Sequence, residues 1–298
     1  MAEPDPQFKT RTIRATGVAA LAGLVSTMLG VGGGVVMVPL FALFGVMRVK
    51  RAAGTSLAVI VLVVAVGLVA QLIREPDDVH WVAAGILAVG ALAGTVIGER
   101  LHKLLPEMPF RYAFCAVLVL IAARMLNVIP DTQPIIGGAS DATSVGHVLF
   151  MLAVGLFAGV VGAMFGLGGG VVIVPMLTLA FGYFHDQFTA TRATSLAVIL
   201  PTSLLSAVLH LRAGNVDKAL ALKISPVAAI TAIGGVWLAY HVPQDALKAT
   251  FALLILLATL RLMRKRKSPM PGETLKNSDA TIPEKDYTSR PEERIEGR

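Results

Sequence analysis

The chain has 298 residues, of which 55% are hydrophobic and only 15% charged, and it carries a formal net charge of +7. Soluble domains usually contain about 25% charged residues, so this composition argues against a water-soluble enzyme and against a disordered protein. The basic residues stand between apolar blocks, as in a membrane protein, and not together on one water-facing module, as nucleic-acid binding requires. We therefore expect an all-α polytopic membrane protein that lies in a lipid bilayer and binds no nucleic acid.

Ten apolar segments follow a polar N-terminal segment, 1–15. A helix needs about 20 apolar residues to cross a bilayer, and seven segments approach or reach this length: 55–73, 82–98, 110–129, 146–165, 194–211, 220–239 and 246–263. Three segments are shorter: 16–29, 35–47 and 171–184. As a helix, the second of these would rise only about 20 Å against a hydrocarbon core of about 30 Å. The sequence leaves open whether such segments are re-entrant or span the membrane with a break.

Basic residues indicate how the segments are oriented. Clusters of Lys and Arg occur in alternate connections, beginning with Lys9, Arg11 and Arg14, whereas the linker 130–144 contains neither. Because positively charged connections stay in the cytoplasm, we expect both termini to be cytoplasmic. The tail, 264–298, is basic and contains several prolines, and we expect it to be disordered. Its last four residues, Ile-Glu-Gly-Arg, resemble an engineered protease site.

The chain contains an internal repeat. The stretch 30–39, Gly-Val-Gly-Gly-Gly-Val-Val-Met-Val-Pro, matches 166–175 at an offset of 136 residues, and 55–60 matches 194–199 at an offset of 139. The repeat predicts two transmembrane halves, 16–129 and 145–263, with five segments in each. An odd number of segments places the second half upside down relative to the first, which is the inverted-repeat architecture of many secondary transporters.

The glycine-rich breaks are the strongest indication of a ligand site. Non-helical backbone inside a membrane is tolerated where it is buried in protein or lines a cavity. Each break precedes a short helix whose first N–H groups and dipole favour an anion, and glycine lets a ligand approach the backbone closely. We therefore predict substrate-binding positions at Gly32, Gly33, Gly34 and Val35, and at Gly168, Gly169, Gly170 and Val171. The alternative is that these glycines only permit close helix packing.

Two Thr-Ser pairs are predicted to begin apolar helices at equivalent positions of the two halves. They are Thr55 with Ser56 and Thr194 with Ser195. Their hydroxyls are suited to capping a helix or to donating to an oxyanion, and all four residues are candidate substrate ligands. Arg51 precedes the first pair by four residues and Arg192 precedes the second by two, so the arginines do not align. Arg192 is included among the substrate candidates, although the sequence does not decide which arginine sets topology and which contacts substrate.

The remaining polar residues give weaker signals. Glu99 and Arg100 are predicted to form an ion pair at the membrane boundary. Gln71 and His210 lie near segment ends, where water reaches, and no substrate role is predicted for them. Acidic residues are nearly absent from the apolar segments, so no proton relay is evident, and proton coupling is left open. We predict no catalytic residue, no metal site and no cofactor, and therefore no enzyme.

The doubled motif G-x-G-G-G with a following V-P, together with the Thr-Ser-Leu-Ala stretches, resembles the TauE/SafE sulfite exporter family over about residues 13–263. The resemblance implies that the glycine breaks and Thr-Ser pairs line a path for sulfite, an organosulfonate or a related anion across a bacterial inner membrane. We predict a secondary transporter, specifically an exporter, of a small sulfur-containing oxyanion that works by alternating access. An anion channel and a non-transporting membrane sensor or subunit are the alternatives. The oligomeric state is not predicted.

Overall fold

A computed structural model describes residues 6–47, 49–104, 119, 122–123, 145–180 and 188–263. In this part of the chain the regular elements are helices and no strand occurs, which confirms the predicted all-α class. In chain order they are α1 (Pro6–Leu29), α2 (Gly34–Leu43), α3 (Val49–Arg74), the short 3₁₀ helix η1 (Pro76–Asp78), α4 (Trp81–Leu104), α6 (Val145–Phe165), α7 (Gly170–Ala180), α8 (Phe188–Arg212), α9 (Lys218–Ala239) and α10 (Gln244–Met263). The predicted linker 130–144, the tail 264–298 and nearly all of the predicted segment 110–129 lie outside the described residues.

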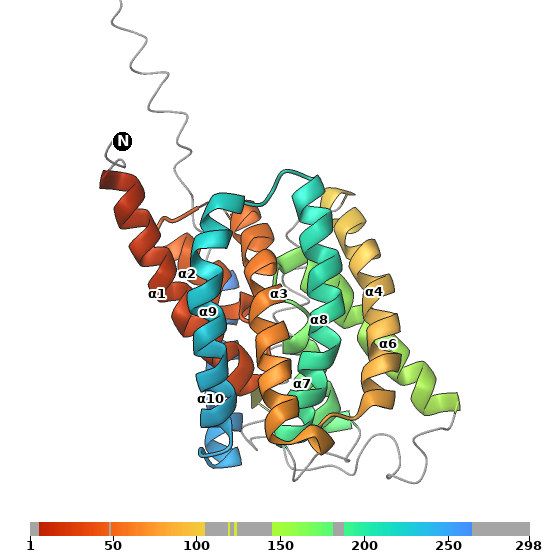
Figure 1. The fold of residues 1–298 in the computed structure, drawn as a ribbon. Coiled ribbons are helices and arrows are strands. Elements are labelled where there is room, and N and C mark those ends of the chain that lie inside the picture. The colour runs from red at the N-terminus through yellow and green to blue at the C-terminus, as the bar shows by residue number, and fades with distance from the viewer. Residues whose placement is uncertain are drawn as a thin grey trace, which may run out of the picture. The chain divides into compact units, whose positions relative to one another are not determined.

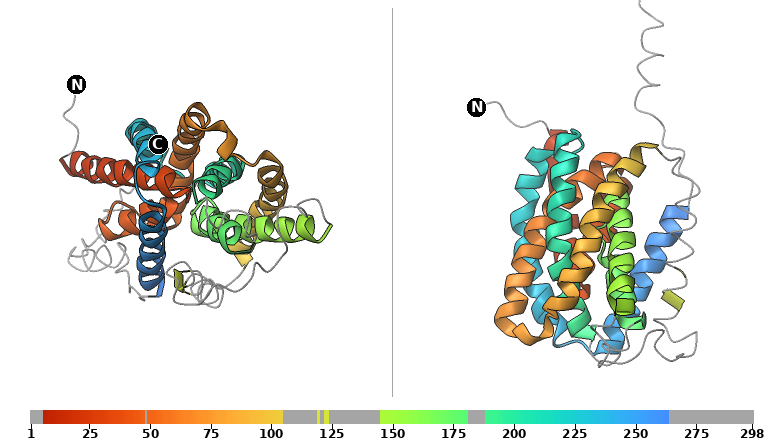
Figure 2. Two further views of the ribbon diagram at one scale, coloured as in Figure 1. Left: turned by 90° about the horizontal axis from the view of Figure 1, so that it is seen from below. Right: turned by 90° about the vertical axis from the view of Figure 1, so that its right-hand side faces the viewer.

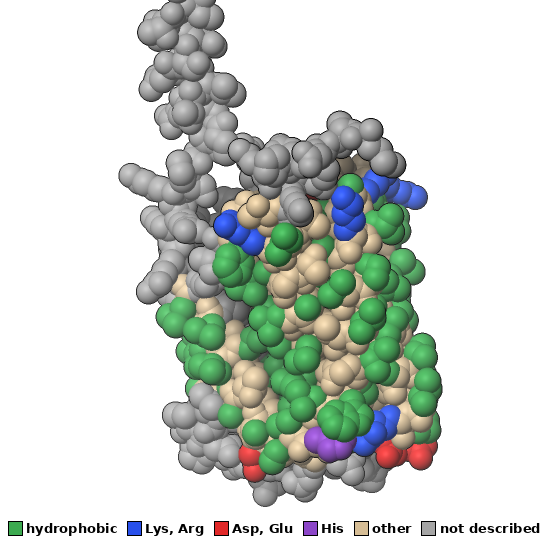
Figure 3. Space-filling view, turned by 60° about the vertical axis from the view of Figure 1, so that its left-hand side comes forward, with side chains coloured by type: hydrophobic (Ala, Val, Ile, Leu, Met, Phe, Trp, Pro, Cys, Tyr) green, Lys and Arg blue, Asp and Glu red, His purple; other side chains and the backbone are tan. Residues whose placement is uncertain are grey.

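Six of these helices are long and apolar enough to cross a membrane. They contain the stretches Thr10–Leu29, Arg51–Arg74, Trp81–Leu101, Val145–Phe165, Phe188–Arg212 and Lys218–Ala239. In the face shown in Figure 3, apolar side chains are spread over the middle of the described surface, most of the Lys and Arg side chains lie at the upper end, and acidic side chains lie at the lower end together with one further basic side chain. This distribution is the one that a bilayer requires of a helical bundle.

Three helices begin earlier than the sequence predicts. The start of α1 is Pro6, inside the predicted N-terminal segment, and α3 and α8 start at Val49 and Phe188. Thr55 and Thr194 therefore lie in the second turn of their helices, and the prediction that the Thr-Ser pairs begin these helices is wrong. The physical reason is that the preceding residues, such as Lys50, Arg51, Ala52 and Ala53, are themselves good helix formers.

The short helices form two helical hairpins. The pair α1–α2 has the first glycine break as its tip, and the pair α6–α7 has the second. Figure 1 shows α1 starting at the upper end of the bundle and α6 starting at the lower end, so the two hairpins enter from opposite sides. Seen from below, α1 and α6 extend outward in opposite directions from a centre that contains α8 (Figure 2).

Each half packs on the other through small residues. Helix α1 lies along α9, α4 lies along α6, and α3 contacts both α8 and α9. A Cβ atom on Gly94 would collide with the carbonyl oxygen of Leu156, and a Cβ on Gly159 would collide with that of Ala91. Small residues let the helix backbones approach this closely, which is how helices associate in a membrane where the lipid is as apolar as the side chains.

Adjacent glycines of α9 provide a direct test of this packing. A Cβ on Gly235 would collide with the carbonyl oxygen of Leu24 in α1, whereas a Cβ on Gly234 would meet nothing within 4 Å. We expect Gly235→Ala to destabilise the protein by about 1–3 kcal/mol, the usual cost of overpacking. Gly234→Ala is the matched control and should melt like the parent protein. Equal melting temperatures of the two purified variants in detergent would contradict the close α1–α9 contact.

Candidate functional site

The two glycine breaks meet inside the bundle. Positive φ angles occur at Gly30, Gly32, Gly33, Gly166, Gly168 and Gly169, in a region that residues with a Cβ rarely adopt. A Cβ on Gly34 would collide with the carbonyl oxygen of Gly166, and a Cβ on Gly170 would lie 2.6 Å from the carbonyl oxygen of Gly30. The backbones of the two tips are therefore in direct contact, and Gly34 and Gly170 make that contact sterically feasible.

The helices that follow the breaks begin at once. The Val36 and Met37 N–H groups donate to the Gly33 carbonyl at 3.1 and 2.9 Å, and the Val172 and Ile173 N–H groups donate to the Gly169 carbonyl at 3.0 and 3.2 Å. Val35 and Val171, the predicted substrate positions, are both buried. The positive ends of the α2 and α7 dipoles therefore lie at the contact between the tips.

Each tip is hydrogen-bonded by a serine of the opposite half. The Ser195 hydroxyl donates to the Gly30 carbonyl at 2.8 Å. The Ser56 hydroxyl is shared between the Gly166 carbonyl at 3.1 Å and the Ala53 carbonyl of its own helix at 2.9 Å. Both serines are fully buried. These bonds satisfy two carbonyls that the positive-φ glycines remove from regular helix, and unsatisfied carbonyls would be costly in a membrane interior.

The neighbouring threonines also bind across the halves. Thr194 Oγ1 accepts from the His80 N–H at 3.1 Å, and Thr55 Oγ1 accepts from the Asp217 N–H at 3.0 Å. His80 precedes α4 and Asp217 is the N-cap of α9. In each contact, therefore, the threonine accepts from an N–H group at the start of a helix of the other half. All four predicted hydroxyls therefore connect one half of the chain to the other, with the backbone as their partner.

Arg192 lies against the first glycine break and is completely buried. A Cβ on Gly30 would lie 2.8 Å from Arg192 Cα. The guanidinium donates through Nη1 to the Thr27 carbonyl at 3.0 Å and through Nη2 to Gln71 Oε1 at 2.7 Å. Its Nε has no hydrogen-bond partner among the described residues, and no described carboxylate forms an ion pair with it. A buried cation with an unused N–H group is the strongest electrostatic feature at the site.

A polar chain extends from Arg192 toward the end of the bundle that contains η1. Gln71 donates to the Tyr240 hydroxyl, which in turn donates to the Asp78 carboxylate. Arg192 Cζ also lies 5.2 Å from the centre of the Tyr240 ring. Partial burial, followed by the hydrogen bond to Asp78, raises the pKa of Tyr240 to about 12, so its hydroxyl keeps its proton near neutral pH. Asp78 therefore places a negative charge near Arg192, and Gln71 and Tyr240 link the two side chains by hydrogen bonds.

The charges at the site are not symmetric. Gly30 packs against Arg192, whereas its counterpart Gly166 packs against Ala53. At the offset of 139 residues, Ala53 corresponds to Arg192 and Gln71 corresponds to His210. Arg51, the other predicted arginine, is exposed near the start of α3. The structure therefore distinguishes the two arginines, because only Arg192 lies beside a glycine break.

Sequence reasoning missed Glu99 and His210. Glu99 is buried and faces His210, with Glu99 Oε2 at 3.4 Å from His210 Nε2, while Arg100 is exposed. The prediction of a Glu99–Arg100 boundary pair is therefore wrong, because consecutive residues of a helix point about 100° apart. The position of His210 one repeat offset after Gln71 is the available signal for His210, whereas Glu99 has the apolar Leu238 at that offset.

A narrow void adjoins the second glycine break. It comprises about 200 Å³ of space between atoms, too narrow to admit a water molecule, and its lining comes from α4, α6, α7, α8 and the second break. Its lining includes Gly168, Gly169, Thr95, Thr202 and Ser206. The direct contact of the tips and this narrow void describe a closed conformation of the site.

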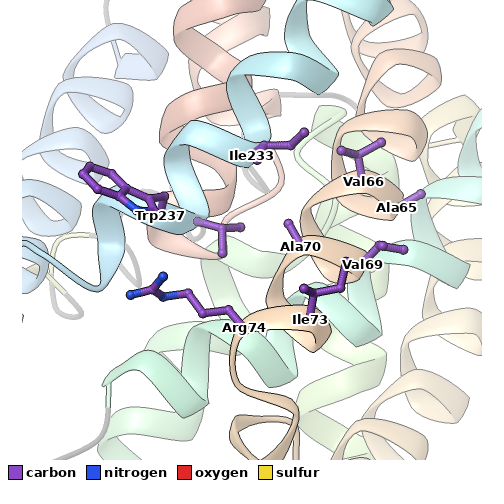
Figure 4. A pocket seen from close by; sticks show the side chains of 9 residues that line it. Ala65, Val66, Val69, Ala70, Ile73, Arg74, Ile233 and Trp237 are labelled. Carbon is purple, nitrogen blue, oxygen red and sulfur yellow. The ribbon is translucent and has the colours of Figure 1, made fainter.

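A wider groove lies elsewhere, on the outer surface between α3 and α9 (Figure 4). It holds about 500 Å³ and is lined by apolar side chains and Arg74. Ile73 and Trp237 on its walls are more than half exposed. None of the predicted substrate residues contributes to it, and its position on the apolar surface is that of a lipid-facing groove.

Comparison with known proteins agrees with the resemblance noted from the glycine motifs. The model of the family described as sulfite exporter TauE/SafE matches residues 2–125 and 151–294. A probable membrane transporter protein, YunE of Bacillus subtilis (strain 168), is 29% identical over 70% of this chain and 81% of its own length. A second one, YdhB of the same organism, is 33% identical over 43% of this chain and 51% of its own length. A probable membrane transporter protein of Haemophilus influenzae is 31% identical over 54% of this chain and 60% of its own length.

The serine bonds across the halves predict a stability difference. Ser195→Ala removes the donor to the Gly30 carbonyl and leaves a buried acceptor unsatisfied, so we expect a loss of about 1–3 kcal/mol. The matched control is Ser225→Ala, because the Ser225 hydroxyl is buried and donates within its own helix, to the Ala221 carbonyl. Thermal unfolding of the purified variants measures both. A Ser195→Ala variant as stable as Ser225→Ala would show that this bond does not hold the tip.

Proposed function

We propose that this protein, which belongs to the sulfite exporter TauE/SafE family, is a secondary transporter of a small sulfur-containing oxyanion such as sulfite or an organosulfonate. The observation that carries the proposal is Arg192, a completely buried guanidinium beside a glycine break of a multi-pass membrane protein. The family description supports the substrate class and the exporter role. The named relatives, which are probable membrane transporter proteins, support transport over catalysis.

Electrostatics favours an anion at this place. An ionised side chain inside a bilayer costs several kcal/mol unless it is paired, and Arg192 has only neutral hydrogen-bond partners among the described residues. The helix N-termini that begin at Gly34 and Gly170 add positive potential at the tips. An oxyanion bound beside Arg192 would neutralise the buried charge and accept the hydrogen bond that Nε does not make. Gly32 and Gly168 would let its oxygens approach the backbone.

The proposed mechanism depends on contacts between the two halves that can break and re-form. We infer that the halves are inverted repeats, since α1 and α6 enter from opposite ends and the serine and threonine bonds occur in matching pairs. Alternating access then consists of separating the tips on one side while the other side stays closed. The closed tips favour a carrier over an open channel, because no path passes between Gly34 and Gly166 in this conformation.

The basic end of the bundle sets the proposed orientation. Arg11 of α1 pairs with Asp217 at 2.9 Å, and Arg51, Arg100 and Arg212 are exposed at the same end. The positive-inside rule places this end, and with it both termini, in the cytoplasm of a bacterial inner membrane. The inside-negative membrane potential would then drive an anion outward, so export needs no dedicated coupling ion.

Counterflow in proteoliposomes tests the proposed function. Vesicles preloaded with unlabelled sulfite or methanesulfonate should transiently accumulate the labelled anion from outside, since a carrier exchanges its substrate. We expect Arg192→Gln to weaken substrate affinity by about tenfold to hundredfold, because a hydrogen bond to a charged group contributes about 1.5–3 kcal/mol. The matched control on the same helix is Arg212→Gln, whose side chain is exposed and should be dispensable.

The outcomes separate the candidate functions. Fast flux without counterflow would indicate a channel, and no flux of sulfur anions or carboxylates would indicate a non-transporting subunit. Unchanged affinity in a folded Arg192→Gln variant would remove Arg192 from the binding site. Size-exclusion chromatography and thermal unfolding establish that each variant is folded before its transport is measured.

A further inference from the structure

Two aspartates occupy equivalent positions at opposite ends of the bundle. At the repeat offset of 139 residues, Asp78 corresponds to Asp217. Asp78 ends η1, shortly before α4, and Asp217 is the N-cap of α9. Figure 1 shows the connection between α3 and α4 at the lower end of the bundle and the start of α9 at the upper end. At the upper, basic end Asp217 forms an ion pair with Arg11 at 2.9 Å.

The two aspartates differ in their connection to the buried cation. Asp78 accepts from the hydroxyl of Tyr240, the C-cap residue of α9. Gln71 of α3 links that hydroxyl to Arg192 of α8. Within the described residues, the ion pair of Asp217 makes no hydrogen bond to Arg192. The repeat therefore supplies an aspartate to each end, and a chain of hydrogen bonds joins the one at the η1 end to the proposed substrate site.

Gln71 is the point at which a substrate would break this chain. Its side chain is fully buried, and its Oε1 accepts from Arg192 Nη2 at 2.7 Å. Its Nε2 donates to the Tyr240 hydroxyl and lies 3.4 Å from Asp78 Oδ2. An oxyanion beside Arg192 is a stronger acceptor than this neutral amide, because attraction between opposite charges adds to the hydrogen bond. Bound substrate therefore draws the guanidinium away from Gln71.

Asp78 supplies the counter-charge of Arg192 while the site is empty. Among the described carboxylates, that of Asp78 is the one whose charge acts on the Arg192 guanidinium. A bound oxyanion takes over this role, and two negative charges then lie near one guanidinium. Like charges repel, and they do so more strongly in a protein interior than in water. Substrate binding therefore weakens the attraction that holds η1 to the bundle.

We propose that Asp78, Tyr240 and Gln71 form a gate at the η1 end that the bound anion itself opens, an inference that rests on the proposed function above. In the empty protein the gate holds the end of α3, the end of α9 and η1 together. Bound substrate replaces Asp78 as the counter-charge of Arg192 and releases the chain at Gln71. The ion pair of Asp217 at the basic end is not coupled to the substrate in this way. Because the η1 end faces away from the cytoplasm in the proposed orientation, an anion that arrives from inside opens its own exit, as export requires.

Val79 provides a reporter for this gate. It lies between η1 and α4 and is only 4% exposed, so a cysteine there reacts slowly while the gate is closed. The experiment uses the full chain with Val79→Cys and Cys115→Ser, which removes the single native cysteine. The protein is placed in lipid nanodiscs and labelled with a polar maleimide. Methanesulfonate should speed this labelling by about five- to hundredfold, the usual range of coupling between two sites.

Three substitutions in this background test the residues of the gate. Asp78→Asn removes the charge and keeps an acceptor for Tyr240, so labelling should be fast without methanesulfonate and change little when it is added. Tyr240→Phe keeps the ring and removes the linking hydroxyl. It should behave in the same way, and it serves as the second variant if the first does not fold. Asp77→Asn is the matched control, since Asp77 is an exposed neighbour in η1, and it should label like the parent protein.

Substrate affinity separates this role from a merely structural one. Coupling between two sites is reciprocal, so a protein whose gate is already released binds the anion more tightly. Structural damage to the site would weaken binding instead. Asp78→Asn should therefore lower the Kd of labelled methanesulfonate, measured by equilibrium dialysis, by up to the factor found for labelling of the parent protein. This measurement does not need the cysteine reporter.

The outcomes distinguish the inference from the proposed function. Labelling of the parent protein that methanesulfonate does not change would overturn the inference alone, provided that the parent protein performs counterflow. An Asp78→Asn variant that labels as slowly and binds as weakly as Asp77→Asn would do the same. Absence of counterflow by the parent protein would overturn the proposed function and this inference with it.

Discussion

The rest of the structure depends on the contact between two glycine tips inside the bundle. Positive φ angles reverse the direction of the chain in each hairpin. The carbonyls of Gly30 and Gly166 then need hydrogen-bond donors in a place where lipid offers none. Ser195 and Ser56 supply those donors from the opposite half. Because each half completes the other, neither tip is satisfied unless both halves are docked. This reciprocity fixes where α3 and α8 lie and how closely α2 and α7 approach.

On this nearly symmetric scaffold the ionisable side chains are arranged asymmetrically. Arg192 stands where the other half has Ala53, and His210 stands where the other half has Gln71. The buried Arg192 therefore lies beside the first glycine break, and the buried His210 lies against Ala163 of α6 near the second. The backbone contacts are thus common to both halves, whereas the ionisable side chains differ between them.

Much of the fold could be predicted from the sequence, because the length of an apolar segment and the position of a glycine break are local signals. The short helices begin within one residue of the predicted Val35 and Val171. The starts of α3 and α8 are not predicted correctly, because a count of apolar residues assigns the polar residues that continue a helix to a loop. The bonds of Ser56 and Ser195 join residues 110 and 165 positions apart, and no local pattern reports such partners. The burial of Arg192 could likewise not be predicted from the sequence, because its neighbours in space come from α1, α3 and the end of α9.

The serine bond to the first tip has a consequence for how the protein is made. The Gly30 carbonyl leaves the ribosome 165 residues before the serine that satisfies it. At about 5–20 residues per second, the first hairpin waits roughly 8–30 s for its partner. The α1–α2 hairpin therefore acquires this contact of its tip only after α8 has been synthesised.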